Sequence, residues 1–216
     1  MQKSFKYYDI ILAVFAAVLL ISNLAGTKLI AFGPITTDGG AVLFPLAYIL
    51  GDVLTEIYGY KYTRRAIWAA FGIMLLAVAA FTVVRYMPPA PEYTAQASYE
   101  AVLGFFPRIV AASLAAFLTG SFLNSFVLAK LKVKTKGEKL WLRLIDTVVF
   151  ALVAFGGILQ GTGMLVYILI GWLFKTGVEV VCLPITYRVI AKMKQIEKID
   201  TYDNKTDFTP FRVNLN

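Results

Sequence analysis

The chain has 216 residues, of which 59% are hydrophobic, and its formal net charge at pH 7 is +8. A soluble domain is closer to half apolar, and the apolar residues here form runs of about 18 or more, long enough to cross a bilayer. A soluble protein is therefore excluded. The basic residues lie mainly between the apolar runs, where they set membrane orientation, so no nucleic-acid partner is predicted.

Six apolar runs predict an all-α bundle of six transmembrane helices, because an isolated strand would leave backbone groups without hydrogen bonds in lipid. The runs are Ile10–Ile30, Ala41–Tyr58, Ala66–Tyr86, Ile109–Leu128, Leu144–Leu159 and Leu165–Ile190. The first run follows two lysines, as in a signal peptide, but it continues past Ile21 without a clear cleavage site. It is therefore interpreted as a membrane span.

Basic residues are concentrated in alternate connections, which predicts the orientation. One set is Lys3 and Lys6, then Lys61, Arg64 and Arg65, then Lys130, Lys132, Lys134, Lys136 and Lys139, then Arg188, Lys192, Lys194 and Lys198. The opposite set has little beyond Lys28, Arg85 and Arg108. The positive-inside rule predicts a multi-pass protein of the cell (inner) membrane with both termini in the cytoplasm. Residues 1–195 form the predicted transmembrane domain and 196–216 a polar tail, and the proline-rich loop 87–107 is expected over the outer mouth.

Polar residues inside the spans are the candidate binding site, because an ionisable group at the bilayer centre costs several kcal/mol and marks function by default. The candidates are Asn23, Asp52, Glu56, Asn124, Asp146, Lys175 and Glu179, with Tyr48 and Phe150 as aromatic walls. Asp52 and Glu56 are four residues apart, as are Lys175 and Glu179, so each pair is predicted to share a helix face. Pro45 and Pro184 are predicted to lie inside helices two and six, where each removes a helix hydrogen bond.

These residues favour a polar central cavity that binds a small polar solute. The alternative is structural: Lys175 would form a buried ion pair with Glu179 or Asp52. The single cysteine, Cys182, and the absence of histidine exclude disulfides, Cys/His metal sites and imidazole catalysis, so no cofactor or metal is expected.

Four segments resemble motifs of one family. They are residues 22–28 (SNLAGTK), 44–60 (FPLAYILGDVLTEIYGY) and 146–150 (DTVVF), and Lys175 and Glu179 with 184–187 (PITY). Over residues 8–195 the chain is similar to the queuosine precursor transporters. The resemblance implies import of 7-cyano-7-deazaguanine, 7-aminomethyl-7-deazaguanine or both. A carboxylate can accept the two adjacent N–H groups of such a base, and its flat ring suits aromatic walls.

One departure from the family lies before helix five. Family members usually have further residues, including Ser-Thr, between the positions of Arg143 and Asp146, whereas here Leu144 and Ile145 join the two directly. Because of this difference, the resemblance defines neither the inner end of that helix nor the role of Arg143.

Two other functions are compatible with parts of the sequence. The first is a substrate-binding membrane subunit of an energy-coupling-factor importer, docked through the small residues Ala13 and Ala17. The second is an intramembrane aspartyl protease, because Gly51-Asp52 matches half of the Gly-x-Gly-Asp signature; Ile49 stands where the first glycine is required. The sequence favours a transporter over an enzyme, and it is compatible with a homo-oligomer.

Overall fold

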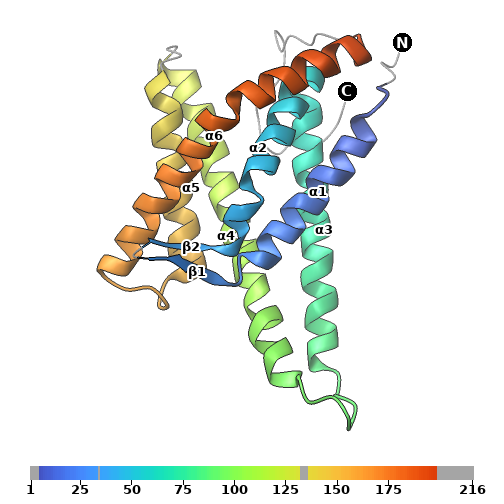
Figure 1. Ribbon diagram of the computed structural model, residues 1–216, viewed down its shortest axis with the longest axis vertical. Helices are drawn as coiled ribbons and strands as arrows, with labels where there is room; N and C mark the ends of the chain where they lie inside the picture. Colours follow the sequence, from blue (N-terminus) through green and yellow to red (C-terminus); the bar gives the residue numbers. More distant parts are fainter. Residues whose placement is uncertain (1–4, 34, 132–135, 199–216) are drawn as a thin grey trace.

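The structure, a computed structural model, describes residues 5–198 apart from 34 and 132–135; the side chains of 32, 44 and 120–142 also lie outside what it describes. It is 81% helical, which confirms the predicted helical class. The elements are α1 (Tyr8–Ala25), β1 (Leu29–Phe32), β2 (Ile35–Asp38), the short 3₁₀ turn η1 (Gly39–Val42), α2 (Phe44–Val53), the π-helical η2 (Leu54–Tyr58), α3 (Tyr60–Tyr86), α4 (Gln96–Leu131), α5 (Lys136–Phe155) and α6 (Thr162–Glu197) (Figure 1).

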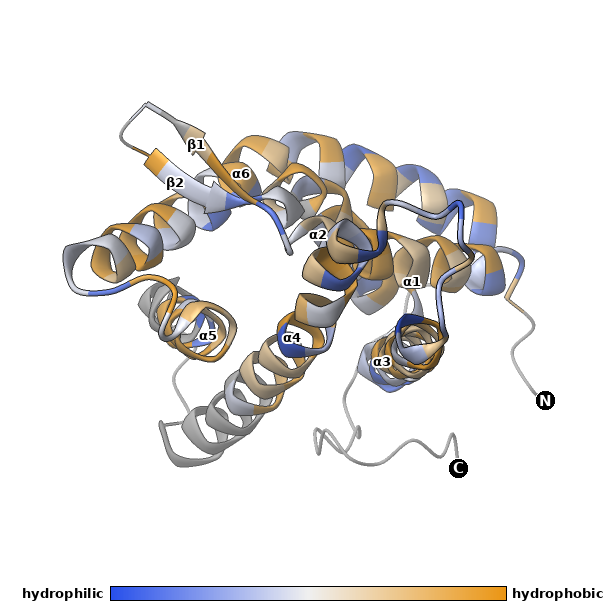
Figure 2. Ribbon diagram, turned by 90° about the horizontal axis from the view of Figure 1, so that it is seen from below, coloured by the Kyte–Doolittle hydropathy of each residue, from blue (hydrophilic) through white to orange (hydrophobic). Residues whose placement is uncertain are grey.

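Four helices in the described part of the chain are long and apolar enough to cross a bilayer: α1, α3, the Gln96–Thr119 part of α4, and α6. Apolar residues make up much of the helices (Figure 2). Large apolar side chains are exposed along the bundle, among them Leu75, Leu76, Val83 and Val84 on α3 and Leu165, Leu169, Leu173, Val180 and Val181 on α6. Lipid accounts for so much exposed apolar surface, which a soluble monomer rarely shows.

The first apolar run differs from the prediction, because α1 ends at Ala25 and Leu29 and Ile30 belong to a β-hairpin. The Thr27 hydroxyl donates to the Leu24 carbonyl at 2.7 Å and so closes the helix end. In the hairpin β1 pairs antiparallel with β2, with Leu29 opposite Asp38. The two strands satisfy each other's backbone groups, which an isolated strand could not do.

The second apolar run is divided into η1, α2 and η2. Pro45 lies in the first turn of α2, where its missing N–H breaks no hydrogen bond, rather than inside the helix as predicted. The ten residues of α2 rise only about 15 Å, half of a bilayer core. The π-helical η2 then ends at Gly59, whose φ of 84° suits glycine.

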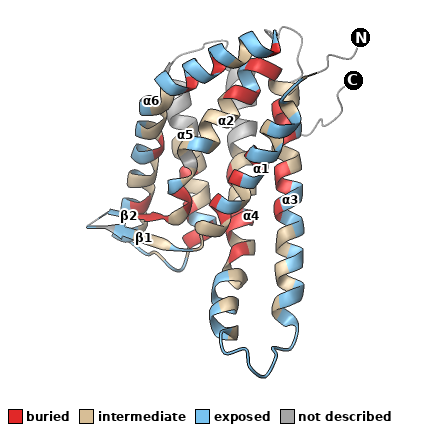
Figure 3. Cartoon of the chain, turned by 45° about the vertical axis from the view of Figure 1, so that its right-hand side comes forward, coloured by how far each residue is buried: buried red, intermediate tan, exposed pale blue. Residues whose placement is uncertain are grey.

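The predicted outer loop 87–107 is shorter in the structure, because α4 already begins at Gln96 and holds Pro107 internally. Prolines 88, 89 and 91 end the preceding helix, whereas the segment after Gln96 is rich in residues that tolerate a helix. The remaining loop joins the far ends of α3 and α4, away from the buried part of the bundle (Figures 1 and 3). Contrary to the prediction, this loop does not cover a mouth of the bundle.

Among the described residues, three apolar clusters hold the bundle together, each formed by a different set of helices. One joins α1, α2, η2, α3 and α6 through Phe15, Val53, Leu54, Ile57, Tyr58, Ala66 and Ile190. The second joins α3 and α4 through Phe71, Met74, Phe106 and Val110. The third joins α4, α5 and α6 through Ile109, Ala112, Ala151, Ala154, Phe155 and Tyr167. The buried residues gather around the hairpin and toward the termini (Figure 3).

A candidate substrate-binding cavity

A cavity of about 280 Å³ lies where all six helices and the end of β2 meet. Its apolar lining comes from Phe15, Leu19, Ile67, Phe71, Met74, Ile109, Ala116, Phe117 and Phe150. Its polar lining comes from Ser22, Asn23, Asp38, Tyr48, Ser113, Asp146 and Lys175, beside Gly26. Pockets that bind drug-sized ligands measure roughly 300–1,000 Å³, so this cavity suits a smaller molecule with a few polar groups.

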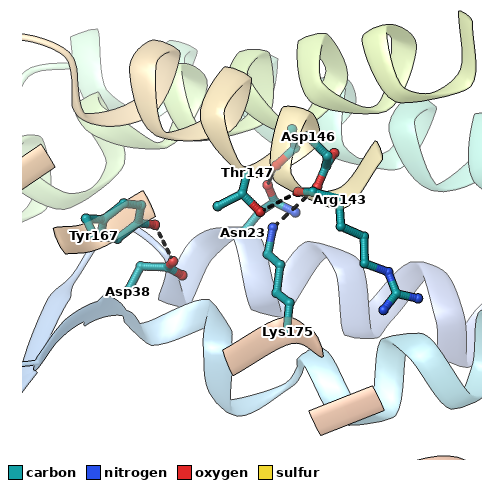
Figure 4. Close-up of polar contacts among 8 residues, drawn as sticks. Asn23, Asp38, Arg143, Asp146, Thr147, Tyr167 and Lys175 are labelled. Carbon is teal, nitrogen blue, oxygen red and sulfur yellow. Dashed lines mark hydrogen bonds and ion pairs between the residues drawn. The ribbon is translucent and has the colours of Figure 1, made fainter. Parts of the chain in front are cut away.

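Two ion pairs connect α5 and α6 beside the cavity. The Lys175 Nζ donates to Asp146 Oδ2 at 3.3 Å (Figure 4), and Arg143 pairs with Glu179 one turn away. The helices run antiparallel, so residues that follow each other on α5 meet residues in reverse order on α6. Lys175 and Glu179 share a helix face as predicted, but Glu179 pairs with Arg143 and not with Lys175.

The Asp146–Lys175 pair belongs to the cavity, whereas the Arg143–Glu179 pair does not line it. Lys175 is almost enclosed, with 10% of its side chain exposed, and its Nζ lies 5.7 Å from the centroid of the Phe150 ring. Asp146 keeps 37% of its side-chain surface exposed. A carboxylate has about four acceptor positions, and the hydrogen bond from Lys175 uses one of them. Asp146 can therefore accept further N–H groups from a ligand.

Asn23 connects two walls of the cavity. Its amide nitrogen donates to the Leu19 carbonyl at 2.8 Å, and its oxygen accepts from the Ser113 hydroxyl of α4 at 2.5 Å. These bonds fix the orientation of an amide that is 8% exposed. Asn23 thus presents a positioned polar group at the boundary between α1 and α4.

Asp38 is a cavity residue that the sequence reasoning did not single out. Its Oδ1 accepts the Gly40 N–H at 2.9 Å and its Oδ2 accepts the Tyr167 hydroxyl at 2.7 Å (Figure 4). Asp38 precedes η1 as its N-cap, a position that aspartate favours. The Asp-Gly-Gly sequence was the available signal, but it reads equally as a turn between two spans.

Close packing holds Asp38 in place, because η1 lies against the end of α1. A Cβ on Gly39 would lie 2.5 Å from the Ala25 carbonyl oxygen, and one on Gly40 would lie 2.8 Å from that of Ser22. The Ser22 hydroxyl also donates to the Gly40 carbonyl at 3.1 Å. Because glycine has no side chain, both positions allow the hairpin to pack close to the cavity.

The structure brings five of the nine predicted binding residues to the cavity: Asn23, Tyr48, Asp146, Phe150 and Lys175. Three others lie elsewhere. Asp52 is half-buried on α2 outside the described lining, and Glu179 belongs to the neighbouring ion pair. The Glu56 side chain is 60% exposed, and its Oε2 lies 3.9 Å from Lys194 Nζ. The side chain of Asn124 lies outside the described residues.

Asp52 and Glu56, which are predicted to share a helix face, lie on either side of the boundary between α2 and the π-helical η2. The short connection in helix five does not interrupt its helix. From Arg143 through Leu144 and Ile145 to Asp146, α5 is continuous.

Comparison with known proteins agrees with a cavity inside a membrane bundle. A family described as "Putative vitamin uptake transporter" matches residues 38–189. The chain is similar to a protein of Bacillus subtilis (strain 168) named "Probable queuosine precursor transporter", with 30% identity over 176 residues that cover 77% of each chain. No solved structure matches the chain.

Proposed function

The chain belongs to the vitamin uptake transporter family, and from this premise we propose that it imports the queuosine precursors 7-cyano-7-deazaguanine and 7-aminomethyl-7-deazaguanine. Family membership and its apolar helices make it a multi-pass membrane transporter rather than an enzyme. The observation that carries the choice of substrate is the Asp146–Lys175 pair on the cavity wall.

The pair offers the hydrogen-bonding pattern that a guanine-like edge requires. That edge presents two adjacent N–H donors followed by a carbonyl acceptor. A carboxylate accepts two donors at once, and the neighbouring ammonium donates to the carbonyl. The Lys175 Nζ lies 3.3 Å from Asp146 Oδ2, so the carboxylate and the ammonium are side by side.

The remaining lining residues suit the ring. Phe150 and Tyr48 offer aromatic surfaces for a flat base, and Asn23 and Ser113 offer polar groups to its other edges. The cavity volume of about 280 Å³ suits a base with one short substituent.

Uptake in bacterial cells that cannot make the precursor tests the proposal directly. Cells that express the chain should form queuosine in tRNA when given either precursor at low concentration. Cells with the empty vector are the control for entry by other routes. No gain of queuosine over that control, with the protein shown in the membrane, would reject the proposed function.

Competition by ordinary bases tests whether the cavity reads the base edge. We expect excess guanine to compete with the precursor, though weakly because it lacks the C7 substituent, and adenine to have almost no effect. Adenine lacks both the paired N–H donors and the carbonyl. The measurement is uptake of labelled precursor with each base in excess, and equal inhibition by adenine would contradict recognition by Asp146 and Lys175.

We propose six crossings with both termini in the cytoplasm. The described ends lie together, since the Glu197 carboxylate accepts the Lys6 and Tyr7 N–H groups, and the 87–95 loop lies at the opposite end (Figure 1). In this arrangement α2 and α5 complete the bundle beside the four helices that are long and apolar enough to cross a bilayer. Reporter fusions at Asn216 should therefore indicate the cytoplasm and fusions near Tyr93 the outside. An external Asn216 would overturn the orientation.

A second candidate is a substrate-binding subunit of an energy-coupling-factor importer. Ala13 and Ala17 are both exposed on α1, so that helix face is open to lipid or to another protein. Co-purification from native membranes with ATPase subunits would favour this role. Uptake by the chain alone in a host without such subunits would favour an independent transporter.

A further inference from the structure

The charges that line the cavity do not balance. Among the described lining residues, the charged side chains are Asp38, Asp146 and Lys175. Two carboxylates against one ammonium leave one net negative charge. The Lys175 Nζ lies 3.3 Å from Asp146 Oδ2, so the charges of these two residues neutralise each other. The remaining negative charge belongs to Asp38.

Asp38 is held by groups that carry no full charge. Its hydrogen-bond donors in the described structure are the Gly40 N–H at 2.9 Å and the Tyr167 hydroxyl at 2.7 Å, and the residue is 5% exposed. Two neutral hydrogen bonds offset only part of the cost of burying a carboxylate. A cation that enters the cavity would supply the missing compensation.

We infer that Asp38 makes the cavity selective for a substrate that carries a positive charge. This inference rests on the proposed function, and it separates the two precursors. The 7-aminomethyl form carries a primary amine, which is protonated at neutral pH. The 7-cyano form is neutral, and its nitrile nitrogen is an acceptor that would repel a carboxylate. The cationic precursor is therefore the preferred substrate of this chain.

The position of Asp38 allows it to act on the substituent while another group reads the base. Asp38 lies at the end of β2, whereas Asp146 and Lys175 lie on α5 and α6 (Figure 4). All three line the same cavity. One base can thus contact the ion pair with its donor-donor-acceptor edge and Asp38 with its ammonium.

Binding by the purified protein in detergent tests the inference. Labelled 7-aminomethyl-7-deazaguanine is displaced by each unlabelled precursor, for the wild type, Asp38→Asn and Tyr167→Phe. A charge-assisted hydrogen bond corresponds to about a tenfold to hundredfold affinity difference, so the wild type should prefer the aminomethyl form by that factor. Asp38→Asn should lose this preference, because its affinity for the aminomethyl form should fall more than its affinity for the cyano form.

Tyr167→Phe is the matched control, since it removes one hydrogen bond to Asp38 without changing the charge. We expect it to shift the affinities for both precursors by a similar factor, so the preference remains. Thermal melting of each variant confirms that it is folded. The wild-type comparison needs no variant and stays decisive if Asp38→Asn does not fold.

The outcomes separate the inference from the proposed function. If the wild type binds neither precursor, the proposed function is wrong. If it binds both and the cyano form equally or more tightly, the proposed function stands and the inference is overturned. If a folded Asp38→Asn protein loses both precursors equally, Asp38 serves some other cation, such as a coupling proton, and the inference is likewise overturned.

Discussion

Asp146→Asn is expected to prevent uptake at low precursor concentration while the protein still inserts and folds. Asparagine keeps the size of the side chain, but it presents one acceptor oxygen and one donor group, so the two N–H groups of the base lose their bidentate partner. A hydrogen bond to a charged group contributes about 1.5–3 kcal/mol, so affinity should fall about tenfold to a hundredfold. Binding of labelled precursor to the purified variant measures the change.

A double substitution separates recognition from simple ion pairing. If Asp146 and Lys175 only neutralise each other, replacing both by Asn and Met should restore a stable and active protein, because a buried pair can often be exchanged for neutral groups. If they read the base, the double variant should fold and remain inactive. Uptake at the wild-type level by the double variant would reject the binding role.

The neighbouring ion pair supplies the matched control. Arg143 and Glu179 connect the same two helices one turn away, with about a quarter of each side chain exposed, and they do not line the cavity. Arg143→Met combined with Glu179→Gln should change thermal stability more than it changes substrate affinity. Loss of binding equal to that of the Asp146 variant would mean that any disturbance between α5 and α6 disables the site.

The sequence predicts the helices well where length and hydropathy alone decide. The long apolar runs within α3 and α6 are found as helices, because a chain in lipid has few other ways to satisfy its backbone. The hairpin is missed, since Leu29 and Ile30 are as apolar as the helix before them. What ends α1 is packing: Gly39 and Gly40 let η1 approach its last turn.

The sequence predicts which types of residue form the candidate site, but it does not predict which of them contact one another. A rule about buried charges finds Asp146 and Lys175 on separate helices, but the register that brings them within 3.3 Å depends on how α5 packs on α6. Helical periodicity also does not show that Glu56 lies largely exposed beside Lys194 rather than at the cavity. Asp38 is not among the predicted binding residues, because an aspartate before two glycines is an ordinary turn signal. Its position at the cavity depends on tertiary structure.

Glu197 gives the last prediction, because it ties the end of α6 to two other elements. Its carboxylate accepts the Lys6 N–H at 3.0 Å, the Tyr7 N–H at 2.8 Å and the Tyr58 hydroxyl at 2.8 Å, and the residue is 8% exposed. Phe5 and Tyr8 pack against the Tyr58 ring at the same point. The predicted domain boundary after residue 195 would remove this carboxylate, so we expect the folded unit to extend to Lys198.

Two truncations that differ by three residues test this boundary. A chain that ends at Gln195 leaves three donors without their acceptor, at about 1–3 kcal/mol for each one that water does not reach. Its melting temperature in detergent should therefore fall by roughly 2–12 °C for each such donor, since 1 kcal/mol corresponds to about 2–4 °C for a chain of this size. A chain that ends at Lys198 keeps Glu197 and should melt close to the full-length protein. Tyr58→Phe removes one donor of the three and should show a smaller decrease. Equal melting temperatures for the two truncated chains would show that Glu197 does not hold the termini together.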